Sequence, residues 1–173
     1  LGVPSVDGSP VETDHRKIWQ RFAENFHLFR GTPTGHWIKD ELITVFGVKE
    51  KLNGESAQRI YDHLQEQLAK EEFSPRALFM RFNIETLCTT DAATDTLAEH
   101  RSLLEEGFPR PIRPTFRPDA VVNIDAPGWR RNIALLSERA GIDVHSYRSF
   151  IQALEERRAY FKSLGAVATD HAA

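Results

Sequence analysis

Asn83-Ile84-Glu85-Thr86-Leu87-Cys88-Thr89-Thr90-Asp91 is a short β-type run that ends in small polar residues. Before it, apolar residues recur at spacings of three and four, the pattern of one buried helix face. Within it that spacing is lost, which predicts a buried strand over 84–90. The change divides the chain into a helical block, 1–82, and a mixed block, 83–173.

The mixed block alternates strand-like and helical segments. An amphipathic helix closed by Gly107 follows the first strand, and strands are predicted again at 112–117 and 166–170. Helices near 127–140 and 146–164 separate those two strands. Strands joined by helical crossovers are parallel. The order β-α-β-α-α-β therefore predicts the α/β class.

The helical block contains start and stop signals for helices but no strand-like segment. Asp14 is positioned to cap one helix, and Ser74-Pro75 opens another with a cap followed by proline at the first turn. Two further helices are expected near 34–46 and from about Ser56. We expect the core of an all-helical subdomain over 14–82 to include Trp19, Phe22, Phe26, Trp37 and Phe46.

The first of these helices carries its apolar stripe at Ile18, Phe22, Phe26 and Phe29. The third helix is expected to bury Ile60, Leu64 and Leu68.

Polar side chains follow each predicted strand. The strand ends read Thr90-Asp91, Arg117-Pro118-Asp119 and Asp170-His171, and the carboxyl ends of parallel strands share the edge where ligands bind. Capping of the next helix is the alternative for each Asp, but Arg and His cap poorly. Glycine-rich nucleotide loops and Gly-x-Ser-x-Gly are absent from the sequence. The functions that these strand ends could still serve are acid-base chemistry, metal binding and carboxylate binding.

Composition narrows the class of protein. The 173 residues include 22 Lys and Arg against 25 Asp and Glu, for a net charge of -3, which argues against a nucleic-acid partner. No apolar run is long enough to predict a membrane span. Cys88, the only cysteine, excludes an internal disulfide, fits a reducing cytoplasmic location and is expected to pack inside its strand.

Several segments together resemble the uronate isomerases, a divergent family of the amidohydrolase superfamily. The matching segments are Phe29-Arg30-Gly31-Thr32-Pro33-Thr34 with Trp37, Phe46-Gly47, Arg81 through Asp91, Arg117-Pro118-Asp119, and Gly165 through His171. The resemblance implies a partial (β/α)₈ TIM barrel of about three parallel strands, with residues 1–82 as a helical insertion subdomain. It also implies interconversion of aldo- and keto-hexuronates in hexuronate catabolism, such as D-glucuronate with D-fructuronate or D-galacturonate with D-tagaturonate.

The length suggests an internal fragment of such an enzyme. A complete barrel takes about 250 residues and eight strands, whereas three strands are predicted here. The family's His-x-His on the first strand, its His-Tyr pair and the Asp of its last strand have no counterpart in this sequence. We therefore expect the chain alone to be inactive.

The resemblance also implies roles for individual residues. Arg117 would clamp the sugar carboxylate, with a salt bridge to a nearby Asp as the alternative. Trp37 would contact substrate, unless it belongs to the helical core. Asp170 and Asp91 are the catalytic candidates, with helix capping as the alternative for Asp91. His171 is the candidate metal ligand, oriented by Asp170, or an ordinary hydrogen-bonding residue.

For the full-length protein we expect a hexuronate substrate, a divalent metal such as zinc, and a homo-oligomer, with no metal bound by this chain alone and no nucleic-acid or membrane partner. Two alternatives remain open. One is a non-catalytic helical interaction module on an α/β base. The other is a metal-dependent hydrolase of the amidohydrolase superfamily, which would not need Arg117 aimed at a carboxylate.

Overall fold

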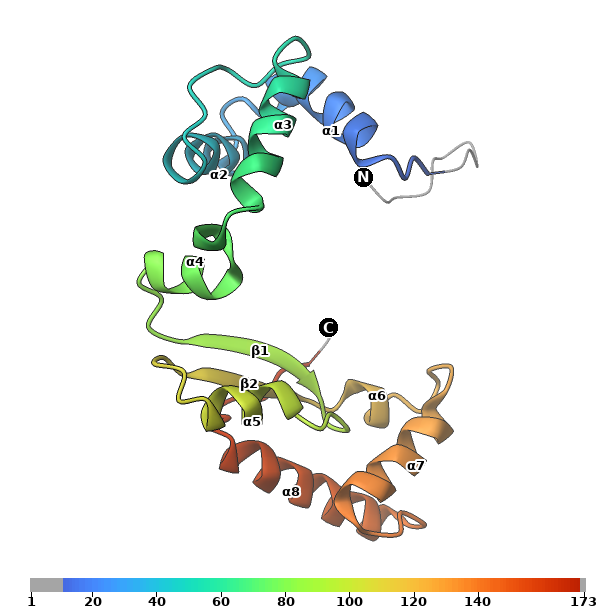
Figure 1. Ribbon diagram of the computed structural model, residues 1–173. Helices are drawn as coiled ribbons and strands as arrows, with labels where there is room; N and C mark the ends of the chain where they lie inside the picture. Colours follow the sequence, from blue (N-terminus) through green and yellow to red (C-terminus); the bar gives the residue numbers. More distant parts are fainter. Residues whose placement is uncertain (1–10, 172–173) are drawn as a thin grey trace. The chain divides into compact units, whose positions relative to one another are not determined.

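The computed structural model describes residues 11–171, and the chain divides into two compact units between Phe82 and Asn83 (Figure 1). In its described part, residues 11–82, the first unit consists of helices joined by loops. Its elements are α1 (His15–Glu24), the 3-10 helix η1 (Phe26–Phe29), α2 (Pro33–Asp40), the π-helix η2 (Glu41–Val45), α3 (Ala57–Leu68), the 3-10 helix η3 (Glu71–Phe73) and α4 (Pro75–Arg81).

Two predicted caps of the first unit are confirmed. The Asp14 side chain accepts hydrogen bonds from the backbone N–H groups of Arg16 and Lys17 and so begins α1. The Ser74 side chain accepts from the N–H of Ala77, with proline at the first turn of α4. These side chains satisfy N–H groups that have no partner within the helix.

The core of the first unit lies between α1, α2, η2 and α3. Its members are Ala23, Leu42, Val48, Leu52, Ala57 and Ile60, surrounded by Trp19, Phe22, Phe26, Ile38, Phe46 and Leu64. The expectation that Trp37 belongs to this core is wrong, because its side chain is 67% exposed. Ile38 and Leu42, four residues apart, face the core, so Trp37 lies outside that stripe. Leu68, in the last turn of α3, is also exposed rather than buried.

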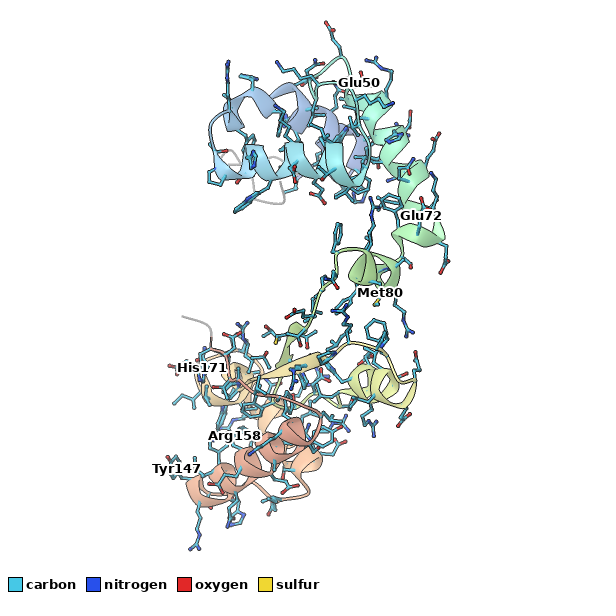
Figure 2. The ribbon with its side chains drawn as sticks, turned by 90° about the vertical axis from the view of Figure 1, so that its left-hand side faces the viewer. Glu50, Glu72, Met80, Tyr147, Arg158 and His171 are labelled. Atoms are coloured by element: carbon cyan, nitrogen blue, oxygen red, sulfur yellow. The ribbon has the colours of Figure 1, made fainter. Side chains whose placement is uncertain are left out.

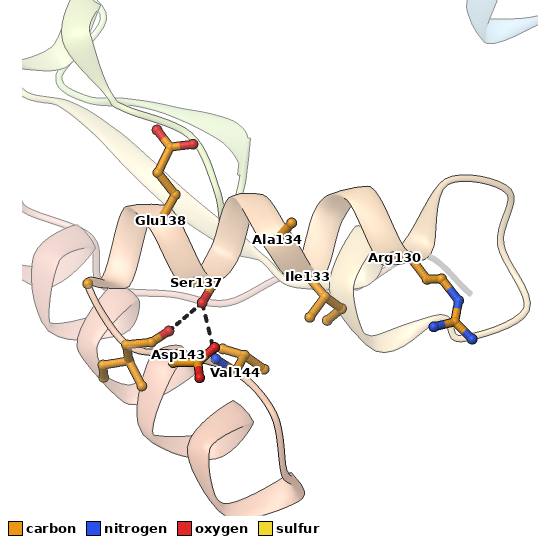
Figure 3. Close-up of a pocket in the computed structure, with 9 residues that line it drawn as sticks. Arg130, Ile133, Ala134, Ser137, Glu138, Asp143 and Val144 are labelled. Carbon is orange, nitrogen blue, oxygen red and sulfur yellow. Dashed lines mark hydrogen bonds between the residues drawn. The ribbon is translucent and has the colours of Figure 1, made fainter.

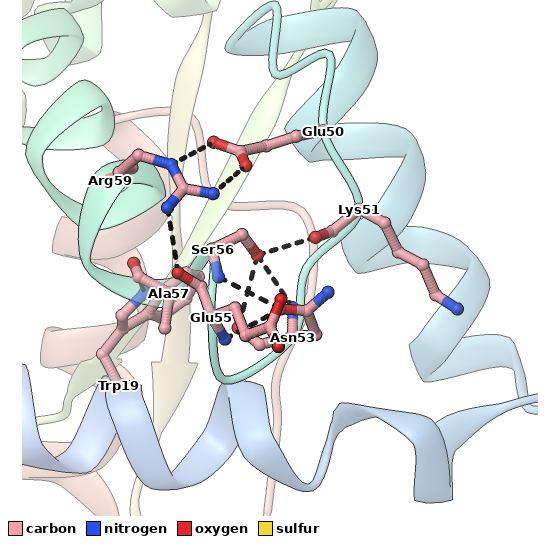
Figure 4. A network of polar contacts seen from close by, with 8 residues as sticks. All are labelled: Trp19, Glu50, Lys51, Asn53, Glu55, Ser56, Ala57 and Arg59. Atoms are coloured by element: carbon pink, nitrogen blue, oxygen red, sulfur yellow. Dashed lines mark hydrogen bonds and ion pairs between the residues drawn. The ribbon is translucent and has the colours of Figure 1, made fainter.

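The loop before α3 is held by polar side chains (Figure 4). The Ser56 hydroxyl donates to the carbonyl of Lys51 at 2.7 Å and accepts from the N–H of Asn53 at 3.0 Å. The indole Nε1 of Trp19 donates to the carbonyl of Ala57 at 2.7 Å. The start of α3 is therefore joined both to its own loop and to α1.

The second unit, described over residues 83–171, contains two parallel strands and four helices there. These are β1 (Leu87–Ala92), α5 (Ala98–Glu105), β2 (Ile112–Arg117), α6 (Asp119–Val122), α7 (Trp129–Ala140) and α8 (Tyr147–Ser163). The strands pair in register from Leu87 with Ile112 to Ala92 with Arg117. The parallel pairing confirms the α/β class, although β1 begins at Leu87 rather than at Ile84.

The predicted third strand at 166–170 is wrong in extent. The segment pairs with β2 only through one isolated parallel bridge, between Thr169 and Phe116. Phe116 makes both hydrogen bonds, donating to the carbonyl of Ala168 at 3.3 Å and accepting from the N–H of Asp170 at 3.0 Å. Two residues earlier β2 has Pro114, which lacks an N–H, so this ladder cannot extend towards Ala166.

One face of the two strands is covered by helices. Phe116 is buried on this face and meets Phe161 of α8 with ring centroids 5.1 Å apart, edge to face. Figure 1 shows α5 and α8 on the same side of the strands. The core here comprises Ala93, Leu97, Phe116, Val121, Leu136, Ala153 and Phe161.

The other face of the strands is not covered in the same way. Cys88 is exposed, so the expectation that it packs inside the strand is wrong. Its register partner is Arg113, and partners in a parallel pair lie on the same face. Within residues 11–171, no helix has both the length and the apolar character required to cross a bilayer.

Candidate functional site

The charged residues at the ends of β2 and of the 166–170 segment come together in the structure. Arg117 forms an ion pair through Nη2 with a carboxylate oxygen of Asp170, and its Nε lies 3.6 Å from Oδ2 of Asp119. The side chains of Arg117 and Asp170 are 38% and 36% exposed. The predicted convergence of strand ends therefore holds for Arg117 and Asp170, and it leaves a partly accessible guanidinium.

Main-chain hydrogen bonds fix the backbone beneath this pair. The N–H of Ala93, just after β1, donates to the carbonyl of Arg117 at 2.9 Å, and the N–H of Asp170 donates to the carbonyl of Phe116 at 3.0 Å. The end of β2 is thus held from both neighbouring segments, at Phe116 by one and at Arg117 by the other. Its salt bridge to nearby Asp residues, which was the alternative to a substrate clamp, is present in the structure.

Asp91 lies on the other face of the sheet. It is the register partner of Phe116, whereas Arg117 pairs with Ala92, and side chains alternate between faces along a strand. The Asp91 side chain is 15% exposed and accepts a hydrogen bond of 2.6 Å from the Thr89 hydroxyl. Its prediction as a catalytic residue gains no support from this geometry.

Thr89 links Asp91 to a buried histidine that the sequence analysis did not single out. The Nε2 atom of His100, on α5, lies 2.9 Å from the Thr89 hydroxyl oxygen. A hydroxyl has one proton, and the 2.6 Å contact assigns it to Asp91. Nε2 is then the donor to Thr89, and the three side chains form a hydrogen-bonded chain that joins α5 to β1.

His171, the candidate metal ligand, follows Asp170 as an exposed residue (Figure 2). Across residues 11–171, no three His, Cys, Asp or Glu side chains gather as a metal-binding group. His171 therefore supplies at most one ligand, and the described residues by themselves do not fit a metal centre. Trp37 lies in the first unit, exposed on α2.

A shallow pocket of about 530 Å³ lies along α7 and the loop after it (Figure 3). Its lining includes Ile133, Ser137 and Val144. The Ser137 hydroxyl donates to the carbonyl of Ile142 at 2.6 Å and accepts from the N–H of Val144 at 3.1 Å. These contacts close the turn between α7 and α8, and none of the predicted site residues lines the pocket.

Arg157 on α8 is a second residue that the sequence analysis missed. It is 5% exposed and donates to main-chain carbonyls of the segment after β1. A signal was available, because Ala153, Arg157 and Phe161 are spaced by four residues and share the buried stripe of α8. A charged residue inside such a stripe needs polar partners.

Comparisons with known proteins agree with one another. A sequence model of the family described as glucuronate isomerase matches residues 6–173. The chain is 65% identical over its whole length to a uronate isomerase of Nostoc punctiforme and 48% identical over 99% of its length to one of Rhizobium meliloti, spanning 36% of each relative.

Two solved structures have the same fold over the matched region. A crystal structure of glucuronate isomerase from Caulobacter crescentus matches with a TM-score of 0.87 and 39% identity, over 98% of this chain and 35% of that one. A crystal structure of uronate isomerase from Thermotoga maritima matches with a TM-score of 0.82 and 34% identity, over 95% and 35%. The chain thus spans about a third of the length of its relatives.

Proposed function

Because the chain belongs to the glucuronate isomerase family, we propose that the full-length protein interconverts aldo- and keto-hexuronates in hexuronate catabolism. We further propose that this chain supplies the side chain that binds the substrate carboxylate, at the carboxyl end of β2. The substrates would be D-glucuronate with D-fructuronate, or D-galacturonate with D-tagaturonate. The observation that carries the second part is the position of Arg117. Its partly exposed guanidinium lies at the carboxyl end of β2 beside Asp170.

Arg117 suits a sugar carboxylate for a chemical reason. The planar guanidinium presents paired N–H donors that match the two oxygens of a carboxylate. Asp170 holds one of its nitrogens from one side and Asp119 lies near another, which restricts rotation of the side chain. We assign binding of the substrate carboxylate to Arg117 and orientation of its fork to Asp170.

Isomerisation moves a proton between C2 and C1 of the sugar through an enediol, and it needs a base near C2 and a proton donor at the carbonyl oxygen. The chain spans about a third of its relatives, so we assign proton transfer to the remainder of the full-length protein. The catalytic role of Asp170 remains a prediction beside its assigned role in orienting Arg117. The catalytic role of Asp91 remains a prediction, which its position on the helix-covered face does not favour.

The architecture of the whole enzyme is also part of the proposal. The crossover from β1 to β2, followed by the bridge to Thr169, supports consecutive units of a (β/α)₈ barrel of the amidohydrolase superfamily, with the first unit as its helical insertion. We further propose a cytoplasmic homo-oligomer, the location being favoured by the single cysteine of the chain. Zinc or another divalent metal would require ligands beyond His171, and no step is assigned to it.

The decisive experiment compares acids with a neutral sugar. The full-length protein is incubated with D-glucuronate, D-galacturonate and D-glucose, and the keto products are measured. We expect turnover of one or both uronates and at least a hundredfold lower kcat/KM for D-glucose, which lacks the carboxylate. Equal activity on D-glucose, or inactivity on every hexuronate, would contradict the proposal.

A further inference from the structure

The guanidinium of Arg157 makes an unusual set of buried contacts. Its Nε donates to the carbonyl of Ala93 at 2.9 Å and its Nη2 to the carbonyl of Asp95 at 2.6 Å. A weaker contact of 3.4 Å joins Nη1 to the carbonyl of Arg139 in α7. One side chain of α8 thereby joins the segment after β1 to a second helix.

The segment after β1 is held at further points. The Tyr160 hydroxyl, one turn further along α8, donates to the carbonyl of Thr96 at 2.6 Å. Leu97 is fully buried with φ of +51°, a left-handed conformation that is strained for leucine. Such a conformation persists only where the surrounding structure enforces it. Residues 93–97 are therefore a fixed loop, and α8 supplies much of that fixation.

A single residue connects this loop to the candidate site. Ala93 accepts from Arg157 through its carbonyl and donates through its N–H to the carbonyl of Arg117. We propose that Arg157 is a positioning residue for the carboxylate-binding site, acting on the backbone of Arg117 through Ala93. The proposal rests on the proposed function for its assignment of Arg117 to the substrate carboxylate.

Burial and charge make this arrangement costly to lose. Burial lowers the pKa of Arg157 below its ordinary value, and the ring of Tyr160 lies 4.3 Å from the guanidinium carbon. The three carbonyl contacts and the aromatic face compensate for removing the guanidinium from water. An apolar side chain here would leave the carbonyls of Ala93 and Asp95 in the loop, and that of Arg139 in α7, without this donor and would release the loop.

The test uses the full-length protein with Arg157→Met, Arg157→Lys and a matched control, Leu136→Ala. Leu136 is fully buried in the same core, but its side chain cannot hydrogen-bond to the loop. The measurements are KM and kcat for D-glucuronate, the melting temperature, and hydrogen exchange at the amides of Ala93 and Leu87. Leu87, which donates to Pro111 at the far end of β1, is the internal reference.

We expect Arg157→Met to raise KM at least tenfold and to speed exchange at Ala93 at least tenfold relative to Leu87. Leu136→Ala, at a comparable loss in melting temperature, should leave KM within about twofold and the two amides in their original ratio. Arg157→Lys keeps the charge but not the fork, and it should fall between wild type and Arg157→Met. If Arg157→Met does not fold, the test rests on Arg157→Lys, for which we expect at least a threefold change both in KM and in the ratio of exchange at Ala93 to exchange at Leu87.

The proposal is overturned if the Arg157 variants match Leu136→Ala in KM and in the exchange ratio, since Arg157 would then act on stability alone. Inactivity of the wild-type protein on hexuronates would defeat the proposed function instead. In that case the exchange ratio still decides whether Arg157 positions the backbone next to Arg117.

Discussion

Asp91, the penultimate residue of β1, and Arg117, the last residue of β2, lie one position out of register, so their side chains leave the sheet on opposite faces. Asp91 shares the helix-covered face with Phe116, and Arg117 shares the other face with Ala92. A common edge therefore does not place these two charged groups in one site. Only the second face presents a partly exposed cation, and the predictions below follow from that asymmetry.

Arg117→Lys in the full-length protein should lower kcat/KM for hexuronates about ten- to a hundredfold. Lysine keeps the charge but loses the paired donors, and a hydrogen bond to a charged partner is worth roughly 1.5 to 3 kcal/mol. The melting temperature should barely change, because partly exposed ion pairs contribute little. Arg113→Lys, on the same strand, is the control. Full activity with reduced stability would make Arg117 a structural salt-bridge residue.

Thr89→Val should reduce the free energy of unfolding by about 1 to 3 kcal/mol. The substitution removes the partly buried hydroxyl that hydrogen-bonds to both Asp91 and His100. Thr90→Val is the matched control on the opposite, exposed face and should change stability by no more than about 0.5 kcal/mol. Denaturant titration measures both. A loss of kcat without loss of stability in Thr89→Val would instead support the catalytic role predicted for Asp91.

Trp37→Ala should leave stability nearly unchanged, since the side chain is 67% exposed. Ile60→Ala, in the core of the same unit, should cost about 2 to 5 kcal/mol. If Trp37 contacts substrate, as the family resemblance implies, Trp37→Ala should raise KM for hexuronates while the melting temperature stays constant. An unchanged KM would remove Trp37 from the site.

Ser146→Ala should destabilise the second unit by about 1 kcal/mol. The Ser146 hydroxyl accepts from the N–H of Ser149, and the Ser149 hydroxyl accepts in return from the N–H of Ser146, so the change opens the capping box of α8. Ser163→Ala, at the other end of α8, lacks such a role and serves as the control. Thermal unfolding followed by circular dichroism distinguishes the two variants.

The 173-residue chain, assayed alone, should show no isomerase activity at any metal concentration, because it spans only 36% of its Nostoc relative. Isomerisation requires a base placed within about 3 Å of the C2 proton. The edge of β1 that pairs with no strand within residues 11–171 should also promote self-association, measurable by light scattering. A monomeric chain that interconverts D-glucuronate and D-fructuronate would contradict both expectations.

Local signals in the sequence predicted much of the fold. Asp14 and Ser74 are caps whose partners lie within three residues, and such contacts can be read from spacing alone. The parallel pairing of β1 with β2 followed from the helical crossover between them. A third parallel strand was predicted at 166–170, but its reduction to one bridge at Thr169 was not, because that depends on which residue of β2 lies opposite and on Pro114, two residues before the bridge.

The candidate site was predicted only in part, for a related reason. Arg117 and Asp170 were placed at one edge correctly, since that follows from strand direction. Which face each side chain occupies depends on register, which is why Asp91 was grouped with them. The role of Arg157 depends on contacts across more than 60 residues of sequence, with Ala93 and Asp95 at separations of 64 and 62.

The exposed thiol of Cys88 has a practical consequence. Cys88 pairs in register with Arg113, which lies four residues before Arg117 on β2, so Cys88 and Arg117 lie on the same face of the sheet. The chain has no other cysteine. A thiol-reactive fluorophore attached there would label this chain at one position, on the face that carries the guanidinium. Its emission would then offer an optical titration of carboxylate ligands that needs no catalytic turnover.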